Sequence, residues 1–376
     1  MTDAILSWEE AGKTLSARWH SERAASAPKR LIVVDDTLKA DAAYHLACEG
    51  TAMLWRGDFH NARQLLQAMA RRIDRKPAKS SSDPRENFNL HRQAQSQRAR
   101  ILSMLLVRLA PEYHLDLGRA PEVGEACEEA FGASREPLLI SLRELLGIIG
   151  AHEWRKQGVD IPVLGAKIHP HYGVFSPLRG EYLDLVAQAP LPSRELAFDI
   201  GTGTGVIAAI LARRGVQRVI ATELDSRALA CARENIDLLG LSQQVEVIEA
   251  DLFPQGKAPL IVCNPPWLPA RPSSSLEHAI YDADSRMLLG FLNGLAAHLT
   301  SGGEGWLILS DLAEHLGLRS RDELLASIEQ AGLQVMERID TRPRHGKAKD
   351  PTDPLYAARR LEVTSLWRLA AKRPAD

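Results

Sequence analysis

The sequence predicts an α/β protein whose C-terminal part forms a doubly wound, mostly parallel sheet. From Arg194 onward, short apolar segments alternate regularly with segments of helical periodicity. This alternation is typical of parallel strands with helices on both faces of the sheet. A glycine-rich segment, residues 199–205, follows the first of these strands where a helix is expected to begin. Because 376 residues exceed one compact core, we also expect a separate N-terminal domain.

The C-terminal domain is predicted to span residues 161–376 and to hold seven strands. The expected strands are Leu196–Ile200, Val219–Glu223, Val245–Ala250, Leu260–Cys263, Gly305–Ser310, Gln334–Thr341 and Leu361–Leu369. The expected helices are Val206–Arg214, Ser226–Leu238, Arg286–Leu299 and Ser320–Ala331. The last helix opens with Ser-Arg-Asp-Glu, a capping-box sequence. The last two strands would close the sheet as a pair with a long loop between them.

The N-terminal region, residues 1–160, is predicted to recognise the substrate and to be mainly helical, with a small α/β domain as the alternative. Its expected helices are residues 1–25, Ala40–Cys48, Asn61–Arg72, Arg98–Leu109, Val123–Phe131 and Pro137–His152. Its expected strands are Leu31–Val34 and Thr51–Trp55. The segment Lys76–Asn89 is polar and rich in serine, which is typical of a loop. The domain boundary is expected between Gln157 and Pro192.

Composition narrows the classes of function. No apolar run reaches the roughly 20 residues that cross a bilayer, and the first residues lack the pattern of a signal peptide. The four cysteines lie far apart with no CxxC pair, which favours a reducing cytoplasm and argues against a zinc ribbon. His169 and His171 lack a third ligand at suitable spacing, so we expect no metal site. The net charge of −2 does not by itself indicate a nucleic-acid partner.

The strongest local signal is the segment Asp199-Ile200-Gly201-Thr202-Gly203-Thr204-Gly205 at the end of an apolar strand. Glycines at such a turn let the backbone approach a bound ligand closely. Glu223 ends the next strand, where an acid accepts hydrogen bonds from ribose hydroxyls. The alternative is a tight strand-to-helix turn followed by a solvated acid. The combination of loop and acid favours a nucleoside-containing cofactor.

This segment resembles the first motif of the class I S-adenosylmethionine-dependent methyltransferases, which has the form D/E-x-G-x-G-x-G. The resemblance covers about residues 165–370 and implies S-adenosyl-L-methionine as the cofactor. It implies that the methionine portion lies over Gly201, Thr202, Gly203 and Gly205. It further places Asp199 near the amino group, Glu223 on the ribose, Asp251 on the adenine amine and Leu252 against the adenine face.

The strand Leu260–Cys263 is followed by Asn264, Pro265, Pro266 and Trp267, which we call the NPPW motif. It resembles the N/D-P-P-Y/F/W motif of methyltransferases that modify planar nitrogens. Such a nitrogen is a poor nucleophile because its lone pair is delocalised. The Asn264 side-chain oxygen and the Pro265 carbonyl can accept its hydrogens and orient the lone pair. The prolines stiffen the turn, and Trp267 can stack on a flat target. The alternative is a proline-rich turn capped by a buried tryptophan.

A segment before the glycine loop resembles stretches that fold over the cofactor in related enzymes. Residues 173–176 look like the matching stretch of ribosomal guanine-N2 methyltransferases, and residues 177–181 loosely resemble that of release-factor glutamine methyltransferases. The resemblance implies that Phe175 and Glu181 approach the cofactor.

The sequence leaves the substrate open between RNA and protein. The target would be a base of ribosomal or transfer RNA, or a protein glutamine, as in the families that the motifs resemble. Residues 71–100 and residues 342–360 are rich in Lys and Arg, so each could contact phosphates or remain a solvated surface loop. A catalytically silent cofactor-binding module is the alternative from another class, and the intact NPPW motif argues against it.

Overall fold

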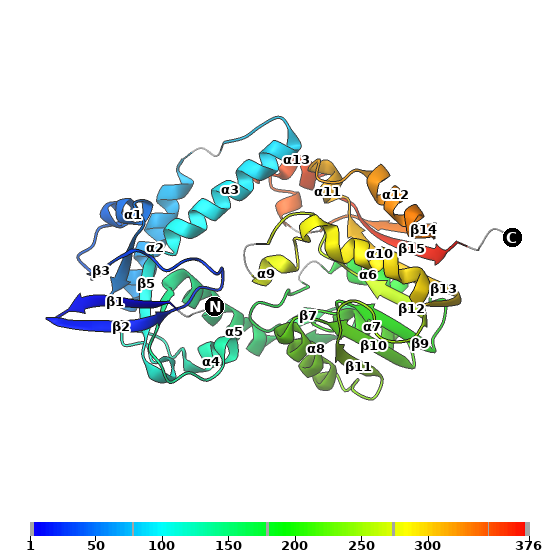
Figure 1. Ribbon diagram of the computed structural model, residues 1–376, viewed down its shortest axis with the longest axis horizontal. Helices are drawn as coiled ribbons and strands as arrows, with labels where there is room; N and C mark the ends of the chain where they lie inside the picture. Colours follow the sequence, from blue (N-terminus) through cyan, green and yellow to red (C-terminus); the bar gives the residue numbers. More distant parts are fainter. Residues whose placement is uncertain (1–3, 77–78, 178–179, 273–274, 345, 373–376) are drawn as a thin grey trace. The chain divides into compact units, whose positions relative to one another are not determined.

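The computed structural model describes residues 4–76, 79–177, 180–272, 275–344 and 346–372 (Figure 1). The chain folds into two compact units. The N-terminal unit comprises Met1–Ser81 and Asn89–Glu153, and the C-terminal unit comprises Ser82–Phe88 and Trp154–Asp376. The change at Trp154 falls inside helix α5 (Leu142–Gln157).

The C-terminal unit contains a seven-stranded sheet with the strand order β11-β10-β9-β12-β13-β15-β14. The strands are β9 (Leu196–Ile200), β10 (Arg218–Glu223), β11 (Val245–Glu249), β12 (Ala258–Cys263), β13 (Leu299–Ser310), β14 (Leu333–Thr341) and β15 (Thr364–Ala371). Neighbouring strands from β11 to β13 pair in parallel, and β15 pairs antiparallel with both β13 and β14. The predicted fold class is confirmed, including the pairing of the last two strands.

Helices cover both faces of this sheet (Figure 1). The helices of the unit are α6 (Glu181–Gln188), α7 (Val206–Arg213), α8 (Ser226–Leu238), α9 (Ser275–His278), α10 (Arg286–His298), α11 (Leu312–His315), α12 (Arg321–Gln330) and α13 (Tyr356–Arg359). A two-stranded hairpin, β7 (Val159–Ile161) with β8 (Ala166–Ile168), precedes them. The predicted capping box is present, because Ser320 Oγ accepts from Glu323 N and the Glu323 carboxylate accepts from Ser320 N.

Side chains of the central strands alternate between the two faces of the sheet, which explains why both faces are apolar. On β12, Leu260 and Val262 pack in the core that holds α7 and α8, whereas Ile261 and Cys263 pack in the core that holds α10 and α12. Side chains alternate between faces with a period of two, so a strand covered on both sides must be apolar throughout. This is why β12 appears in the sequence as a continuous apolar run.

The N-terminal unit is α/β and so follows the alternative prediction for this region. It contains a six-stranded sheet with the order β1-β2-β6-β5-β4-β3. The strands are β1 (Ile5–Glu10), β2 (Lys13–Trp19), β3 (Arg30–Val34), β4 (Thr51–Trp55), β5 (Leu105–Leu109) and β6 (Leu138–Ser141). Its helices are α1 (Ala40–Cys48), α2 (Phe59–Asp74), most of α3 (Pro84–Leu102), α4 (Gly124–Phe131) and much of α5.

Three predicted helices of this region are wrong in whole or in part. Within the segment 1–25, of which residues 1–3 lie outside the described residues, β1 and β2 form an antiparallel hairpin whose turn at Ala11 and Gly12 has positive φ angles of 51° and 74°. The end of Arg98–Leu109 is the strand β5, and the start of Pro137–His152 is the strand β6. Both strands are short apolar runs that are almost wholly buried, and periodicity alone cannot distinguish such runs from buried helix.

The segment Lys76–Asn89, predicted as a loop, is partly helical because α3 already begins at Pro84. Residues 77–78 lie outside the described residues. Proline is well placed in a first helical turn, where its missing N–H would have no intrahelical partner. Within the described ranges, no helix is long and apolar enough to cross a membrane.

Candidate active site

The predicted site residues converge because their strands are parallel neighbours in register. Ile200 of β9 lies opposite Thr222 of β10 and Cys263 of β12. The residues that follow these three strands therefore meet at one edge of the sheet. This edge is formed by the carboxyl ends of the strands, where open α/β sheets bind ligands.

The glycine loop keeps one stretch of backbone uncovered. Gly203 has a φ of +59°, and a Cβ built there would meet no atom within 4 Å. Gly205 has a φ of +82°, and a Cβ there would press on the Ala232 backbone of α8, with its carbonyl oxygen at 3.3 Å. Gly205 therefore serves helix packing, whereas Gly203 leaves open space beside the chain. A bound molecule can approach the backbone at Gly203.

Asp199 is buried within this loop. Its Oδ2 accepts hydrogen bonds from Thr202 Oγ1 at 2.6 Å and from Ala208 N at 3.0 Å. Its Oδ1 is buried and has no hydrogen-bond partner among the residues that the structure describes. Burial, and to a smaller extent the nearby charge of Glu223, raises the pKa of Asp199 to about 7 despite the lowering effect of the two hydrogen bonds. An unpaired buried carboxylate oxygen fits a cationic ligand group, such as the amino group of S-adenosylmethionine.

Glu223 supports the loop from the next strand. Its Oε2 accepts from Gly203 N at 3.0 Å, and its Oε1 accepts from Leu224 N at 2.8 Å and Asp225 N at 3.1 Å. These bonds fix the carboxylate at the edge of the glycine loop. Oε2 accepts only one of these bonds and can accept a second, so Glu223 keeps capacity for a ribose hydroxyl.

Asp251 and Leu252 follow β11. The Asp251 carboxylate forms an ion pair with Arg286 at 2.8 Å, and both side chains are mostly exposed. Leu252 has a positive φ of 70°, and its carbonyl accepts from Thr222 Oγ1 at 2.6 Å. A leucine rarely adopts this conformation, so the Thr222 bond helps to hold a strained turn. The roles of Asp251 and Leu252 toward adenine stay predictions.

The NPPW motif directly follows β12, as predicted. Trp267 Nε1 donates a hydrogen bond to Asn264 Oδ1 at 2.9 Å. The Trp267 ring lies edge-to-face with Tyr182 at a centroid distance of 6.4 Å and packs against both cores of the sheet. Because an indole N–H can only donate, this bond fixes which end of the Asn264 amide is the oxygen. The second lone pair of that oxygen remains for a substrate N–H.

Phe175 and Glu181 belong to the segment before the glycine loop. Glu181 begins α6 and is only 5% exposed, although its side chain carries a carboxyl group. Phe175 is half-buried, and the neighbouring Ser176 Oγ is buried without a hydrogen-bond partner in the described structure. Residues 178–179 lie outside the described residues. The approach of Phe175 and Glu181 to the cofactor remains a prediction.

Sequence reasoning missed two groups near these residues. Tyr182 is buried, and its pKa is raised by burial and by the charges of Asp199 and Glu181. Arg319 lies before α12, and its Nη2 donates to the Trp267 carbonyl at 3.5 Å. The Arg319 Nε is buried with no hydrogen-bond partner among the described residues. Neither residue belongs to a local motif, so only the fold could reveal them.

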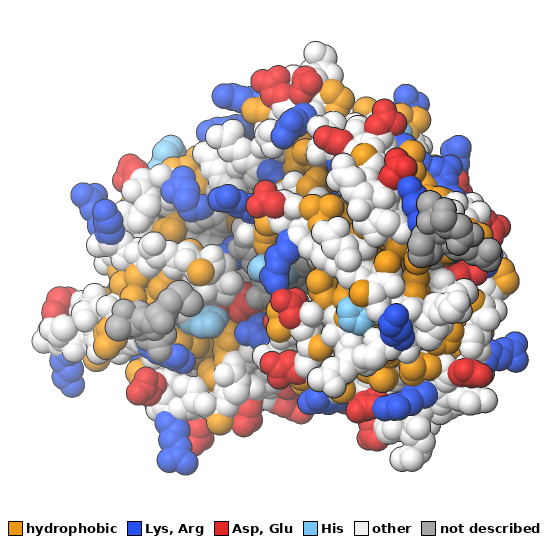
Figure 2. Space-filling view, turned by 45° about the vertical axis from the view of Figure 1, so that its right-hand side comes forward, with side chains coloured by type: hydrophobic (Ala, Val, Ile, Leu, Met, Phe, Trp, Pro, Cys, Tyr) orange, Lys and Arg blue, Asp and Glu red, His pale blue; other side chains and the backbone are white. Residues whose placement is uncertain are grey.

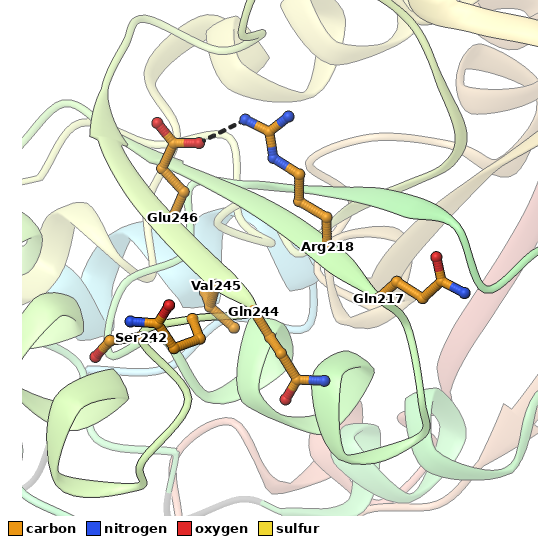
Figure 3. Close-up of a pocket in the computed structure, with 7 residues that line it drawn as sticks. Gln217, Arg218, Ser242, Gln244, Val245 and Glu246 are labelled. Atoms are coloured by element: carbon orange, nitrogen blue, oxygen red, sulfur yellow. Dashed lines mark hydrogen bonds and ion pairs between the residues drawn. The ribbon is translucent and has the colours of Figure 1, made fainter.

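A shallow depression elsewhere on the C-terminal unit is separate from this site. It is lined by Gln217, Arg218, Ser242, Gln243, Gln244, Val245 and Glu246, with an ion pair between Arg218 and Glu246 at 2.8 Å (Figure 3). These residues lie at or before the amino ends of β10 and β11, opposite the edge that carries the glycine loop. Among the described residues, no cluster of three or more His, Cys, Asp or Glu side chains could hold a metal ion.

Comparison with known proteins identifies similar chains. The family described as methyltransferase small domain matches residues 166–330. A release factor glutamine methyltransferase from Cereibacter sphaeroides is 31% identical over 171 residues, which cover 41% of this chain and 59% of that protein. A tRNA1(Val) (adenine(37)-N6)-methyltransferase from Cronobacter sakazakii is 31% identical over 173 residues, covering 38% of this chain and 71% of that protein.

The name of a third relative specifies a different substrate. A ribosomal protein L11 methyltransferase from Pelotomaculum thermopropionicum is 32% identical over 144 residues, covering 38% of this chain and 39% of that protein. The similarity to the release-factor and L11 enzymes therefore spans less than two thirds of their length. The family match begins at Ala166, so it excludes the N-terminal unit described above.

Proposed function

This chain belongs to the family of S-adenosylmethionine-dependent methyltransferases with a methyltransferase small domain, and on that premise we propose that it methylates a planar nitrogen of a translation component. The target would be an exocyclic amino group of a ribosomal or transfer RNA base, or the amide of a protein glutamine. The relatives named above act on release factor, tRNA and a ribosomal protein according to their names, which supports this group of substrates. The N-terminal unit would recognise the substrate.

The observation that carries the proposal is the position of Asn264 Oδ1 directly after β12. This oxygen lies at the edge that holds the glycine loop, and Trp267 orients it through one hydrogen bond. The cofactor supplies an electrophilic methyl group on a sulfonium sulfur. Asn264 Oδ1 would accept one hydrogen of the target nitrogen, and the Pro265 carbonyl would accept the other. Both bonds direct the lone pair toward the methyl group, and both strengthen as the nitrogen gains positive charge.

The buried residues of the loop would hold the cofactor. The free Oδ1 of Asp199 fits its amino group, the open backbone at Gly203 fits its methionine portion, and Glu223 fits its ribose. A proton is lost from the methylated nitrogen after transfer, when that nitrogen is strongly acidic. A strong general base is therefore not required, and water can take up this proton.

The variant Asn264→Ala tests the proposal. Methyl transfer should fall by about 10²–10³-fold, the usual loss for one preorganised polar contact. Calorimetric affinity for S-adenosylmethionine should stay unchanged, because the contact matures in the transition state. The assay follows tritiated methyl groups into RNA and protein fractions of a lysate from a deletion strain, with RNase and protease controls. Transfer at the parental rate would show that the motif is only a turn, and a parent inactive on every fraction would favour a silent module.

A further inference from the structure

Helix α2 divides sharply into an apolar face and a basic face. Its buried residues are Phe59, Ala62, Leu65, Leu66 and Met69. The exposed face carries arginine, glutamine, asparagine and histidine, and the acids at its two ends are already paired. Asp58 forms an ion pair with Arg119 at 2.7 Å, and Asp74 forms one with Arg98 at 2.9 Å. The exposed face therefore has no acid free to neutralise its cations.

Exposed polar side chains, three of them arginines, form a row along this face. Arg63, Gln67, Arg71 and Arg75 recur every fourth residue, and all four are exposed. Four residues of α-helix rise about 6 Å, so the row runs along the helix for about 18 Å. The side chains of Arg63, Arg71 and Arg75 make no hydrogen bond or ion pair with any described residue. Arginines four residues apart repel each other, so this arrangement does not serve helix stability.

The adjoining part of α3 also exposes basic and amide side chains and lacks acidic ones. Residues 89–102 contain no Asp or Glu, and Gln93, Gln97 and Arg100 are exposed. The ion pair between Asp74 and Arg98 joins the end of α2 to α3, and the two helices lie beside each other in Figure 1. We call the exposed residues Arg63, Gln67, Arg71, Arg75, Gln93, Gln97 and Arg100 the arginine surface.

The arginine surface differs from an ordinary mixed surface. Figure 2 shows a face on which Lys and Arg side chains are interspersed with Asp and Glu. In the same N-terminal unit, α4 carries Glu125, Glu128 and Glu129 and no cation. These two helices of the unit, α2 and α4, therefore carry mainly charges of opposite sign. The net charge of −2 hides this segregation, because the acids of other elements balance the arginines.

We propose that the arginine surface binds the sugar–phosphate backbone of an RNA substrate, an inference that rests on the proposed methyl transfer and names its substrate class. Arg, Gln and Asn side chains are among those that contact phosphate and sugar oxygens. Three unpaired cations along one helix match the charges of a polyanion. Recognition of a glutamine in a protein substrate does not require several unpaired cations.

Two arginines of the other basic segment, residues 342–360, already have partners. Arg344 pairs with Asp184 at 3.3 Å, and Arg359 pairs with Asp353 at 3.2 Å with both side chains nearly buried. His345 lies outside the described residues. Paired arginines must lose an existing partner before they contact a phosphate, whereas those of the arginine surface need not.

The test compares two triple variants of the full chain. R63Q/R71Q/R75Q removes three cations from the arginine surface and keeps helix-forming side chains. K29Q/R30Q/R135Q removes three exposed cations from other elements of the same unit and gives the same change in net charge. Binding of labelled transfer RNA and of ribosomal RNA fragments is measured by fluorescence anisotropy at several salt concentrations. Poly-glutamate serves as a competitor, and circular dichroism checks the melting temperature of each variant.

We expect the slope of log affinity against log salt to become shallower by about two to three for the first variant, because three phosphate contacts are lost. The second variant should keep the parental slope. Equal slopes for both variants, no RNA binding by the parent, or equal displacement by poly-glutamate would overturn the inference. Methylation of a protein fraction, unchanged in R63Q/R71Q/R75Q, would also overturn it while the proposed methyl transfer stands. If the parent binds RNA through this surface but methylates nothing, the proposed methyl transfer fails instead.

Discussion

Asn264 and Trp267 act on each other through the hydrogen bond that joins their side chains. The Trp267 ring is held by Tyr182 and by both cores, so its N–H is a fixed donor. A fixed donor holds the Asn264 amide in one orientation before any substrate arrives. Preorganisation of this kind acts on the rate of the chemical step more than on substrate binding.

The variant Trp267→Phe separates these two effects. It keeps an aromatic ring for packing and stacking but removes the hydrogen-bond donor. We expect kcat to fall roughly five- to tenfold, since one neutral hydrogen bond contributes about 1 kcal/mol, while KM changes little. Steady-state methyl transfer measures both values. A rise in KM with kcat unchanged would mean that Trp267 serves mainly to stack on the target.

The proposed contact of Asp199 with the cofactor would make cofactor binding depend on pH. Its pKa is raised to about 7, mainly by burial, so in the cofactor-free protein it is partly protonated near neutral pH. A cationic amino group prefers the ionised carboxylate. Affinity for S-adenosylmethionine should therefore rise as pH increases from about 6 to 8, and Asp199→Asn should bind weakly with a flatter pH profile. Calorimetry across this interval gives the profile, and a parental affinity independent of pH would contradict the assignment.

The raised pKa of Asp199 also makes the free energy of unfolding depend on pH. Unfolded Asp has a pKa of about 3.9, so between about pH 4 and 7 the folded protein holds a proton that the unfolded chain has released. The free energy of unfolding of the cofactor-free protein therefore decreases as pH rises through this interval. Asp199→Asn removes this contribution, which thermal unfolding at several pH values can show.

At the scale of elements, α3 is shared between the two units. Its first residues belong with the C-terminal unit, where Phe88 is 2% exposed and packs in a core with Leu268, Leu312, Leu316 and Leu355. Asn87 Nδ2 also donates to the Pro354 carbonyl at 3.0 Å. A stretch between two N-terminal segments thus completes the core next to the residues that follow the NPPW motif.

Phe88→Ala should destabilise the C-terminal unit, although residue 88 lies in the N-terminal third of the sequence. Loss of a buried phenylalanine costs about 3–5 kcal/mol. Hydrogen exchange should rise in peptides covering Leu312–Leu316 and residues 355–358. The control Leu90→Ala lies two residues further along α3 in the N-terminal unit and should spare those peptides. Faster exchange confined to the N-terminal unit in Phe88→Ala would contradict the division of this helix.

At the scale of the whole molecule, sequence reasoning succeeded where local pattern and global fold agree. The parallel part of the C-terminal sheet repeats one strand–helix unit, and three of its strands have a recognisable residue at or next to their carboxyl ends, namely Asp199, Glu223 and Asn264. Prediction of the N-terminal unit failed at short buried strands such as β5, whose sequence also fits a helix. It failed as well at the β1–β2 hairpin, whose turn lacks a common turn pair. The free Oδ1 of Asp199 and the bond from Trp267 to Asn264 depend on tertiary placement, which no local pattern contains.

The strand order of the C-terminal sheet has a consequence for biosynthesis. β15 follows β14 in the sequence, yet it lies between β13 and β14 in the sheet. While the ribosome is still adding residues 364–371, β13 has an unpaired edge and β14 has no partner in the sheet. The sheet of the nascent C-terminal unit therefore cannot close before β15 has been synthesised. Until then it exposes a strand edge of the kind that favours aggregation and chaperone binding.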